Sequence, residues 1–172
     1  MNVALGSAAL LFGLGASVLG AGTLAVGLVK GRPRLLLLGR SYALLAFVGA
    51  LAAFVVMERA LITRDFTVAY VAENGSTKTP ALFNFATLWA ALEGSILLWA
   101  LILTGYLMAM MRKFRHRQTD PLVGWANLTM LVVCIFFFGL MVTVARAFAP
   151  FDPTPGFDGL GPIPLLHDHI LM

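Results

Sequence analysis

The sequence predicts an all-α integral membrane protein with four transmembrane helices. Three observations predict this fold: 60% of the residues are hydrophobic and only 12% are charged, four long apolar segments run through the chain, and basic residues gather between them. Soluble domains carry about 25% charged residues, so the composition excludes that class. Each apolar segment reaches the roughly 20 residues that cross a bilayer. The segments comprise residues 3–29, 35–57, 81–111 and 122–145.

The basic residues predict the orientation of the helices. Eight of the twelve Lys and Arg residues lie in two clusters, one after the first apolar segment and one after the third. The positive-inside rule places both clusters in the cytoplasm, so the N- and C-termini and the loop over residues 62–80 face outward. We expect a four-span transmembrane bundle over residues 1–147 and an extracytoplasmic Pro/Gly-rich tail over residues 148–172. The clusters contain Lys30, Arg32, Arg34, Arg40, Arg112, Lys113, Arg115 and Arg117.

Three features of the sequence exclude other classes of protein or site. The first segment has no Lys or Arg before it and exceeds the roughly 7–15 apolar residues of a signal peptide, so it is a retained helix. The two basic loops account for the pI of 9.7, and no basic surface interleaved with aromatic residues is present, which excludes nucleic acid as a partner. Cys134 is the single cysteine, which excludes an internal disulfide.

The first segment carries small residues at a regular spacing. Gly6, Gly13, Gly20 and Gly27 recur every seven residues, a spacing that drifts only about 20° per repeat on a helix. The four glycines therefore line one face, and small residues let helices approach closely in lipid. We expect a helix-packing face directed at neighbouring chains or domains. A glycine-lined cofactor slot is the alternative, but no polar group accompanies the glycines.

The second segment and the loop after it predict a membrane boundary. Glu58 and Arg59 end the segment with adjacent opposite charges that suit the outer interface. The loop alternates in polarity over residues 66–70 and breaks at Asn-Gly-Ser, residues 74–76, as a short strand entering a turn would.

The third segment contains a carboxylate, Glu93, about twelve residues or roughly 18 Å from its outer end. A charged carboxylate at that depth costs at least about 2.5–3.5 kcal/mol, so it must be neutral, paired or facing a polar cavity. Trp89 lies on the same helical face, and we assign Glu93, Trp89 and Trp99 to one candidate polar site. Two roles stay open: a hydrogen bond that locks helices together, or a proton relay, ion pathway or cofactor-orienting group.

The tail combines many prolines and glycines with apolar residues. Phe148, Phe151, Phe157 and Leu160 supply more apolar anchors than a flexible linker carries, so the tail is expected to be an ordered or partner-bound extended loop.

The histidines His167 and His169 form an H-x-H pair near the end of the chain. The i, i+2 spacing can place both rings on one metal or haem iron when the segment is extended. Polar residues in a loop at the membrane surface are the alternative reading.

Four stretches together resemble a known family. They are Gly31-Arg32, DFTVAYVAENGS at residues 65–76, LWAALEGSILLW at residues 88–99 and Pro-Leu-Leu at residues 164–166. The sequence is similar to the N-terminal part of CcmF, the haem-lyase subunit of bacterial cytochrome c maturation. It departs from that pattern at Leu92, where many relatives have a histidine, and it stops at Met172, before the family's His-Pro-Pro motif.

This resemblance implies a function and a set of partners. The complete protein is expected to lie in the bacterial plasma membrane, to receive haem from a haem chaperone, and to attach it to apocytochrome c delivered by thioredoxin-like and TPR subunits. The chain would be a fragment or one part of a split CcmF, and the rest of CcmF or a partner chain would hold most of the haem. Membrane lipid is a further partner. The alternative is a proton- or ion-translocating transporter subunit that uses Glu93.

Overall fold

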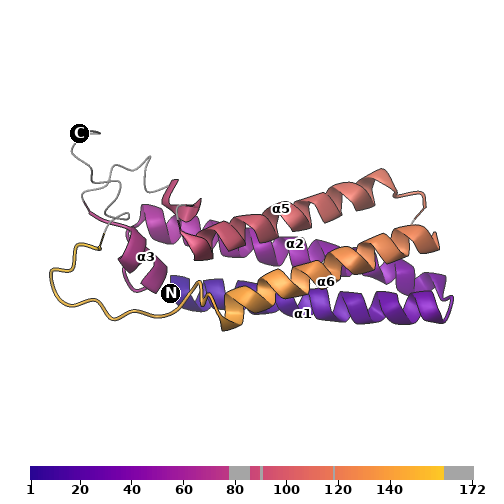
Figure 1. Cartoon of the computed structure of the whole chain (residues 1–172), viewed down its shortest axis with the longest axis horizontal. Coiled ribbons are helices and arrows are strands. Elements are labelled where there is room, and N and C mark those ends of the chain that lie inside the picture. The colour runs from indigo at the N-terminus through magenta and orange to yellow at the C-terminus, as the bar shows by residue number, and fades with distance from the viewer. Residues whose placement is uncertain (78–85, 90, 118, 161–172) are drawn as a thin grey trace.

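The computed structural model describes residues 1–77, 86–89, 91–117 and 119–160. Four helices in this part of the chain are long and apolar enough to cross a membrane, as predicted. They pack as a bundle in which α1 and α5 each contact both α2 and α6 (Figure 1). The long helices are α1 (Asn2–Val29), α2 (Pro33–Ile62), α5 (Leu92–Lys113) and α6 (Pro121–Thr143); the short ones are α3 (Ala69–Asn74) and the 3-10 helix η1 (Thr87–Trp89).

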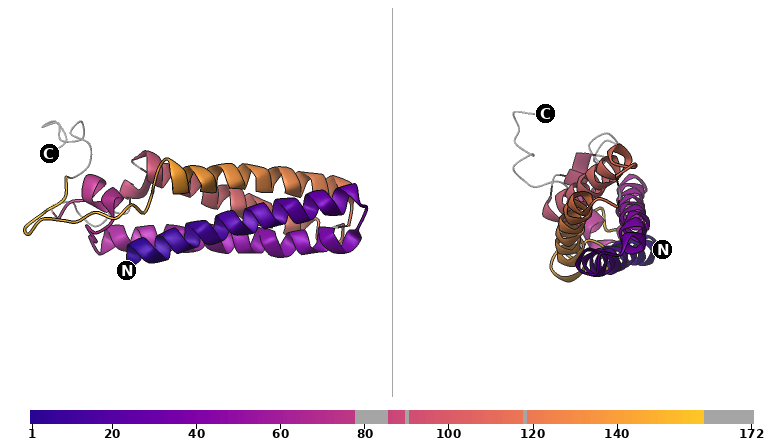
Figure 2. Two further views of the ribbon diagram at one scale, coloured as in Figure 1. Left: turned by 90° about the horizontal axis from the view of Figure 1, so that it is seen from below. Right: turned by 90° about the vertical axis from the view of Figure 1, so that its right-hand side faces the viewer.

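Figure 2 shows the long helices side by side, with different segments gathered at the two ends of the bundle. The N-terminus, α3, η1 and the segment after α6 gather at one end, which we call the α3 end. The connections α1–α2 and α5–α6 lie at the opposite end, which we call the basic end. Both predicted cationic clusters flank those two connections. The antiparallel order therefore brings the clusters to the same end of the molecule.

The four spaced glycines of α1 are all buried. A Cβ at Gly13 would meet the Phe138 ring of α6, and one at Gly20 would meet Tyr42 of α2. Gly27 lies against Leu35, also in α2. The glycine face of α1 thus packs inside this chain, whereas the sequence analysis directed it at neighbouring chains or domains.

At Gly49 the backbone of α2 comes into direct contact with the backbone of α1. A Cβ on Gly49 of α2 would lie 2.7 Å from Cα and 2.8 Å from N of Gly13, and 3.0 Å from the carbonyl oxygen of Ala9. Without a side chain at either glycine the two helices pack at a distance that other residues would prevent. This contact fixes how α1 and α2 sit together.

Two boundaries and one loop conformation differ from the sequence prediction. The helix α2 continues to Ile62, so Glu58 lies inside it and not at its end. The loop forms an isolated bridge at Val68 followed by α3, and the short strand expected over residues 66–70 is wrong. The third span begins at Leu92 and not at residue 81.

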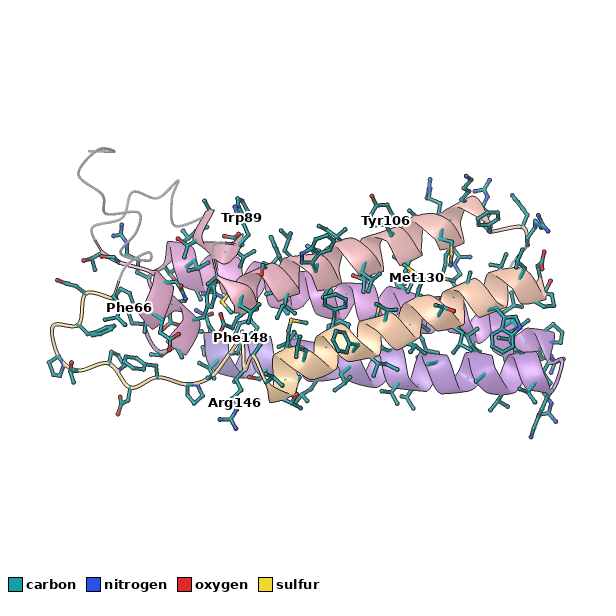
Figure 3. The ribbon with its side chains drawn as sticks, in the orientation of Figure 1. Phe66, Trp89, Tyr106, Met130, Arg146 and Phe148 are labelled. Carbon is teal, nitrogen blue, oxygen red and sulfur yellow. The ribbon has the colours of Figure 1, made fainter. Side chains whose placement is uncertain are left out.

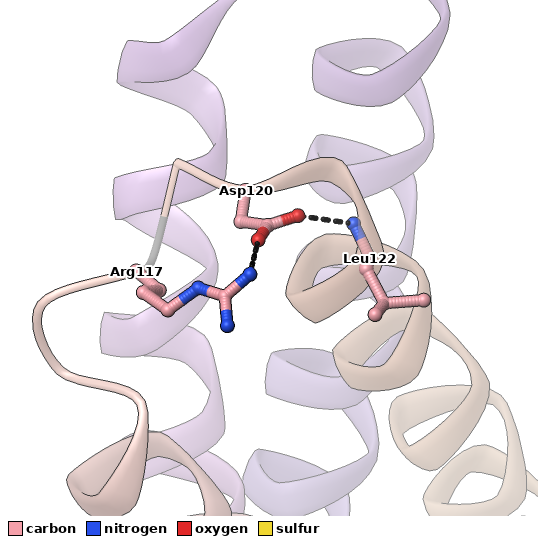
Figure 4. A network of polar contacts seen from close by, with 3 residues as sticks. All are labelled: Arg117, Asp120 and Leu122. Carbon is pink, nitrogen blue, oxygen red and sulfur yellow. Dashed lines mark hydrogen bonds and ion pairs between the residues drawn. The ribbon is translucent and has the colours of Figure 1, made fainter.

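The turns at the basic end have clear local causes. Gly31 adopts a φ of 59°, and the Arg32 N–H donates to the Gly27 carbonyl at 2.9 Å, which is the pattern of a glycine-terminated helix. Asp120 caps α6: Oδ1 accepts from the Leu122 N–H at 3.0 Å and Oδ2 pairs with Arg117 at 2.6 Å (Figure 4). These two hydrogen bonds lower the pKa of Asp120, so the cap stays ionised at neutral pH.

Candidate functional site

The segment after α6 packs along the loop that contains α3. The Ala69 N–H donates to the Ala149 carbonyl at 2.9 Å, and the Phe151 N–H donates to the Thr67 carbonyl at 2.8 Å. Further along, the Leu160 N–H donates to the Ala72 carbonyl at 2.9 Å. Segments some 80 residues apart in the chain are thereby held together at the α3 end.

Aromatic residues support this pairing. The Phe66 and Phe157 rings meet edge to face, with centroids 5.7 Å apart, and Phe151 lies 5.3 Å from Phe157. Phe148 is buried and its ring fills the space beside Gly6. Residues 148–160 thus pack on the loop that contains α3, although two of the four expected anchors are exposed, Phe151 at 38% and Leu160 at 73%.

Tyr70 joins α3 to the start of the third span. Its buried hydroxyl shares one proton between the carbonyl oxygens of Thr87 and Leu88, at 2.7 and 2.9 Å. The residue next to the helix, Ala91, is extended, with φ −123° and ψ 167°. The Tyr70 hydroxyl therefore donates its hydrogen bonds to backbone carbonyls of η1, which precedes α5 in the chain. Hydropathy alone cannot register this break, because the residues on both sides of it are apolar.

Gly94 makes this junction sterically feasible. A Cβ there would collide with the Leu88 carbonyl and lie 2.5 Å from the Tyr70 hydroxyl oxygen. Ser95 follows, and its hydroxyl donates to the Leu92 carbonyl at 2.8 Å. The Glu-Gly-Ser sequence at residues 93–95 thus forms the first turn of α5, and its glycine is the position where the turn contacts η1 and α3.

The structure places Glu93 in the first turn of α5. The expected depth of roughly 18 Å inside a helix is therefore wrong, because the helix starts one residue before the carboxylate. A negative charge in a first turn is favoured by the helix dipole. Burial first, and the nearby Glu93 carboxylate second, raise the pKa of the Tyr70 hydroxyl, so this group stays a hydrogen-bond donor at neutral pH.

Glu58 also belongs to this region, although it was not predicted as a site residue. Its side chain is 8% exposed, and neither carboxylate oxygen has a hydrogen-bond partner among the described residues. The Glu58 charge also contributes to the raised pKa of Tyr70. The Tyr70 hydroxyl is therefore within electrostatic range of two carboxylates, one from α2 and one from α5. The signal in the sequence was its helical spacing of three residues from the apolar Leu61, which is buried.

Of the two predicted tryptophans, Trp89 belongs to η1 and thus to this junction, and Trp99 lies further along α5. Trp89 and Trp99 are 46% and 60% exposed, and Trp89 extends away from the bundle (Figure 3). His167 and His169 lie outside the described residues. Within the described part no group of three His, Cys, Asp or Glu side chains can hold a metal ion.

No histidine among the described residues lies at the α3 end, where its imidazole could bind haem iron. The described part contains one histidine, His116, which lies at the basic end and whose Nε2 accepts from the Arg115 Nε–H at 3.0 Å. The described residues therefore do not supply an axial histidine to a haem at the α3 end.

The Tyr70 hydroxyl gives a direct stability prediction. Tyr70→Phe leaves two buried carbonyl oxygens without their donor, which typically costs about 1–3 kcal/mol. We expect the thermal unfolding temperature of Tyr70→Phe in detergent to fall. Tyr106→Phe is the matched control, because Tyr106 is 68% exposed. Equal unfolding temperatures for the two variants would show that the hydroxyl does not hold the junction.

Comparisons with known proteins agree with this architecture. No family model matches the chain. It is 32% identical over 142 residues to the cytochrome c-type biogenesis protein CcmF of Escherichia coli K12, covering 83% of this chain and 22% of the relative. A solved structure, the cytochrome c haem lyase CcmF, matches with a TM-score of 0.78 and 36% identity over 90% of this chain and 26% of that one. The chain is homologous to the N-terminal portion of the CcmF proteins.

A relative from a second organism matches almost the whole chain. The cytochrome c-type biogenesis protein CycK of Rhizobium meliloti is 29% identical over 168 residues, or 98% of this chain and 25% of the relative. The chain thus spans about a quarter of the length of these relatives and of the solved structure. The four-helix bundle and the α3 end are the part of the CcmF architecture that this chain contains.

Proposed function

We propose that this chain forms the N-terminal four-helix part of a bacterial cytochrome c haem lyase and works together with the remaining CcmF portion or a split partner chain. The fold match to the solved haem lyase carries this proposal. On this basis the complete assembly lies in the plasma membrane, receives haem from a haem chaperone and attaches it to apocytochrome c presented by thioredoxin-like and TPR subunits.

The α3 end faces the extracytoplasmic side in this proposal. The basic end carries eight of the twelve cations, which the positive-inside rule assigns to the cytoplasm. The tyrosine junction and the exposed Trp89 then border the region where haem and apocytochrome meet. Haem itself is held mainly by the rest of the protein or a partner chain, and a contribution from His167 and His169 stays a prediction.

The geometry favours this role over ion transport. The transporter reading placed Glu93 deep inside a span, whereas Glu93 occupies the first turn of α5 and the second carboxylate of this region, Glu58, lies four residues before the end of α2. In the described spans, the buried hydroxyls of Ser17 and Thr104 donate to carbonyls of their own helices. We therefore assign Glu93 to the support of the polar junction, as a positioning residue.

Glu93→Gln tests this assignment. Glutamine keeps the size and hydrogen-bonding capacity of the side chain, so we expect a folded protein that retains much of its cytochrome c assembly, measured by haem-stained gels of membranes. Glu93→Leu removes that capacity and should lower assembly. Glu73→Gln, an exposed carboxylate on α3, is the control. Complete loss of assembly in Glu93→Gln at normal protein level would mean that the charge itself is required.

The function itself is tested by deletion. Cells that lack this chain are expected to accumulate no haem-stained c-type cytochromes, and the chain supplied on a plasmid should restore them. Normal cytochrome c levels in the deletion strain would contradict the proposal.

A further inference from the structure

A groove opens between α1 and α6 at the α3 end. It has a volume of about 290 Å³. Leu10 and Leu11 of α1 form one wall, Met141 and Val142 of α6 form the other, and residues 146–150 close its end. This size is near the lower limit of small-molecule pockets, which start at about 300 Å³. The groove thus suits a narrow apolar chain better than a broad ring system.

Two polar side chains line this groove, Ser7 and Arg146. Arg146 is exposed, and it forms no ion pair with any residue that the structure describes. Its guanidinium extends away from the bundle, while Phe148 points into it (Figure 3). An apolar groove therefore ends at an unneutralised cation, just beyond the last turn of a membrane-spanning helix.

The backbone holds Arg146 in this position. Its φ of 45° lies in the left-handed region, which is uncommon for a residue other than glycine. The Ala149 N–H donates to the Arg146 carbonyl at 2.7 Å, and the buried Phe148 ring fills the space beside Gly6. The turn that presents the arginine is thus anchored on the side facing the core.

We propose that this groove binds an anionic phospholipid, with its phosphate on Arg146 and one acyl chain between α1 and α6. Guanidinium groups bind phosphate with charge-assisted, often bidentate hydrogen bonds. The end of a transmembrane helix is the level of the lipid headgroups. Exposed aliphatic residues surround the groove, among them Leu11 and Val144, so the adjacent surface also suits lipid. This binding is independent of the proposed role in haem attachment.

Lipid binding to the purified chain in a non-ionic detergent tests the proposal without haem or apocytochrome. Native mass spectrometry measures the bound fraction across titrations with dioleoyl phosphatidylglycerol or dioleoyl phosphatidylcholine. We expect the wild-type chain to prefer phosphatidylglycerol, and Arg146→Gly to weaken its binding by about tenfold, the typical effect of one lost charged hydrogen bond. Glycine accepts the positive φ, so this variant keeps the turn.

Two further variants separate the headgroup from the groove. Arg59→Gln removes another exposed cation at the α3 end and should leave phosphatidylglycerol binding unchanged. Val142→Trp fills the groove while keeping Arg146, and should also weaken binding. Equal affinity of the wild type for the two lipids, or unchanged binding in Arg146→Gly, would overturn the proposal. Protection from thermal unfolding by inorganic phosphate equal to that by phosphatidylglycerol would also overturn it, since the ligand would then be a free anion.

Discussion

Gly94→Ala is expected to disrupt the junction between α3, η1 and α5 and to abolish cytochrome c assembly. The added Cβ would collide with the Leu88 carbonyl and lie 2.5 Å from the Tyr70 hydroxyl oxygen. A backbone carbonyl cannot rotate away as a flexible side chain can, so relief requires η1 to move. Overpacking of this kind costs about 1–3 kcal/mol, occasionally more, and we expect the upper end. Thermal unfolding in detergent and haem-stained gels measure the two effects.

Gly105→Ala provides the matched control for this substitution. Gly105 lies in the same helix, and the nearest atom to its added Cβ is 4.0 Å away, on Phe47. Alanine also favours the helix over glycine by about 1 kcal/mol, so the control should be as stable as the wild type or more so. If the two variants have the same unfolding temperature, Gly94 is not as closely packed at the junction as the structure indicates.

Gly49→Leu is expected to prevent α1 and α2 from packing, which makes it the second substitution with a large effect. All three atoms nearest to the new Cβ are backbone atoms of α1, from Gly13 and Ala9, at 2.7 to 3.0 Å. A leucine must separate the helices and remove contacts along the glycine face. We expect a loss above the usual overpacking cost of about 1–3 kcal/mol, measured as low yield of monodisperse protein in size-exclusion chromatography.

Gly22→Leu is the matched control, because it makes the same glycine-to-leucine replacement in a membrane span. It lies in α1, and no atom comes within 4 Å of its added Cβ. We expect this variant to be recovered at the wild-type level. A similar recovery of Gly49→Leu would contradict the close contact between α1 and α2.

The four spans were predictable because hydropathy over about 20 residues reports burial in a bilayer directly. The start of α5 was not, since the residues from Leu88 to Leu92 are all apolar and the break depends on Tyr70, which is distant in sequence. For the same reason Glu93 was placed too deep. Glu58 was missed because adjacent opposite charges at 58 and 59 indicated a helix end, while α2 continues to Ile62.

The candidate site was predictable only in part. The Glu-Gly-Ser sequence was recognised, but the reason for its glycine, a close approach of η1 and Tyr70, appears only in three dimensions. Periodicity correctly placed Gly6, Gly13, Gly20 and Gly27 on one buried face. It could not identify the packing partner, because a small-residue face accepts a helix from the same chain or from another.

Haem content of the purified chain is the most direct test of the central claim, that this is the four-helix part of a haem lyase whose haem is held mainly elsewhere. The chain is purified in detergent, alone and with its co-purifying membrane partners, and examined by haem staining and visible spectroscopy. The account predicts a Soret band in the complex and none in the isolated chain. No haem in either preparation would contradict the claim, and a band in the isolated chain that His167→Ala and His169→Ala remove would place the ligand in this chain instead.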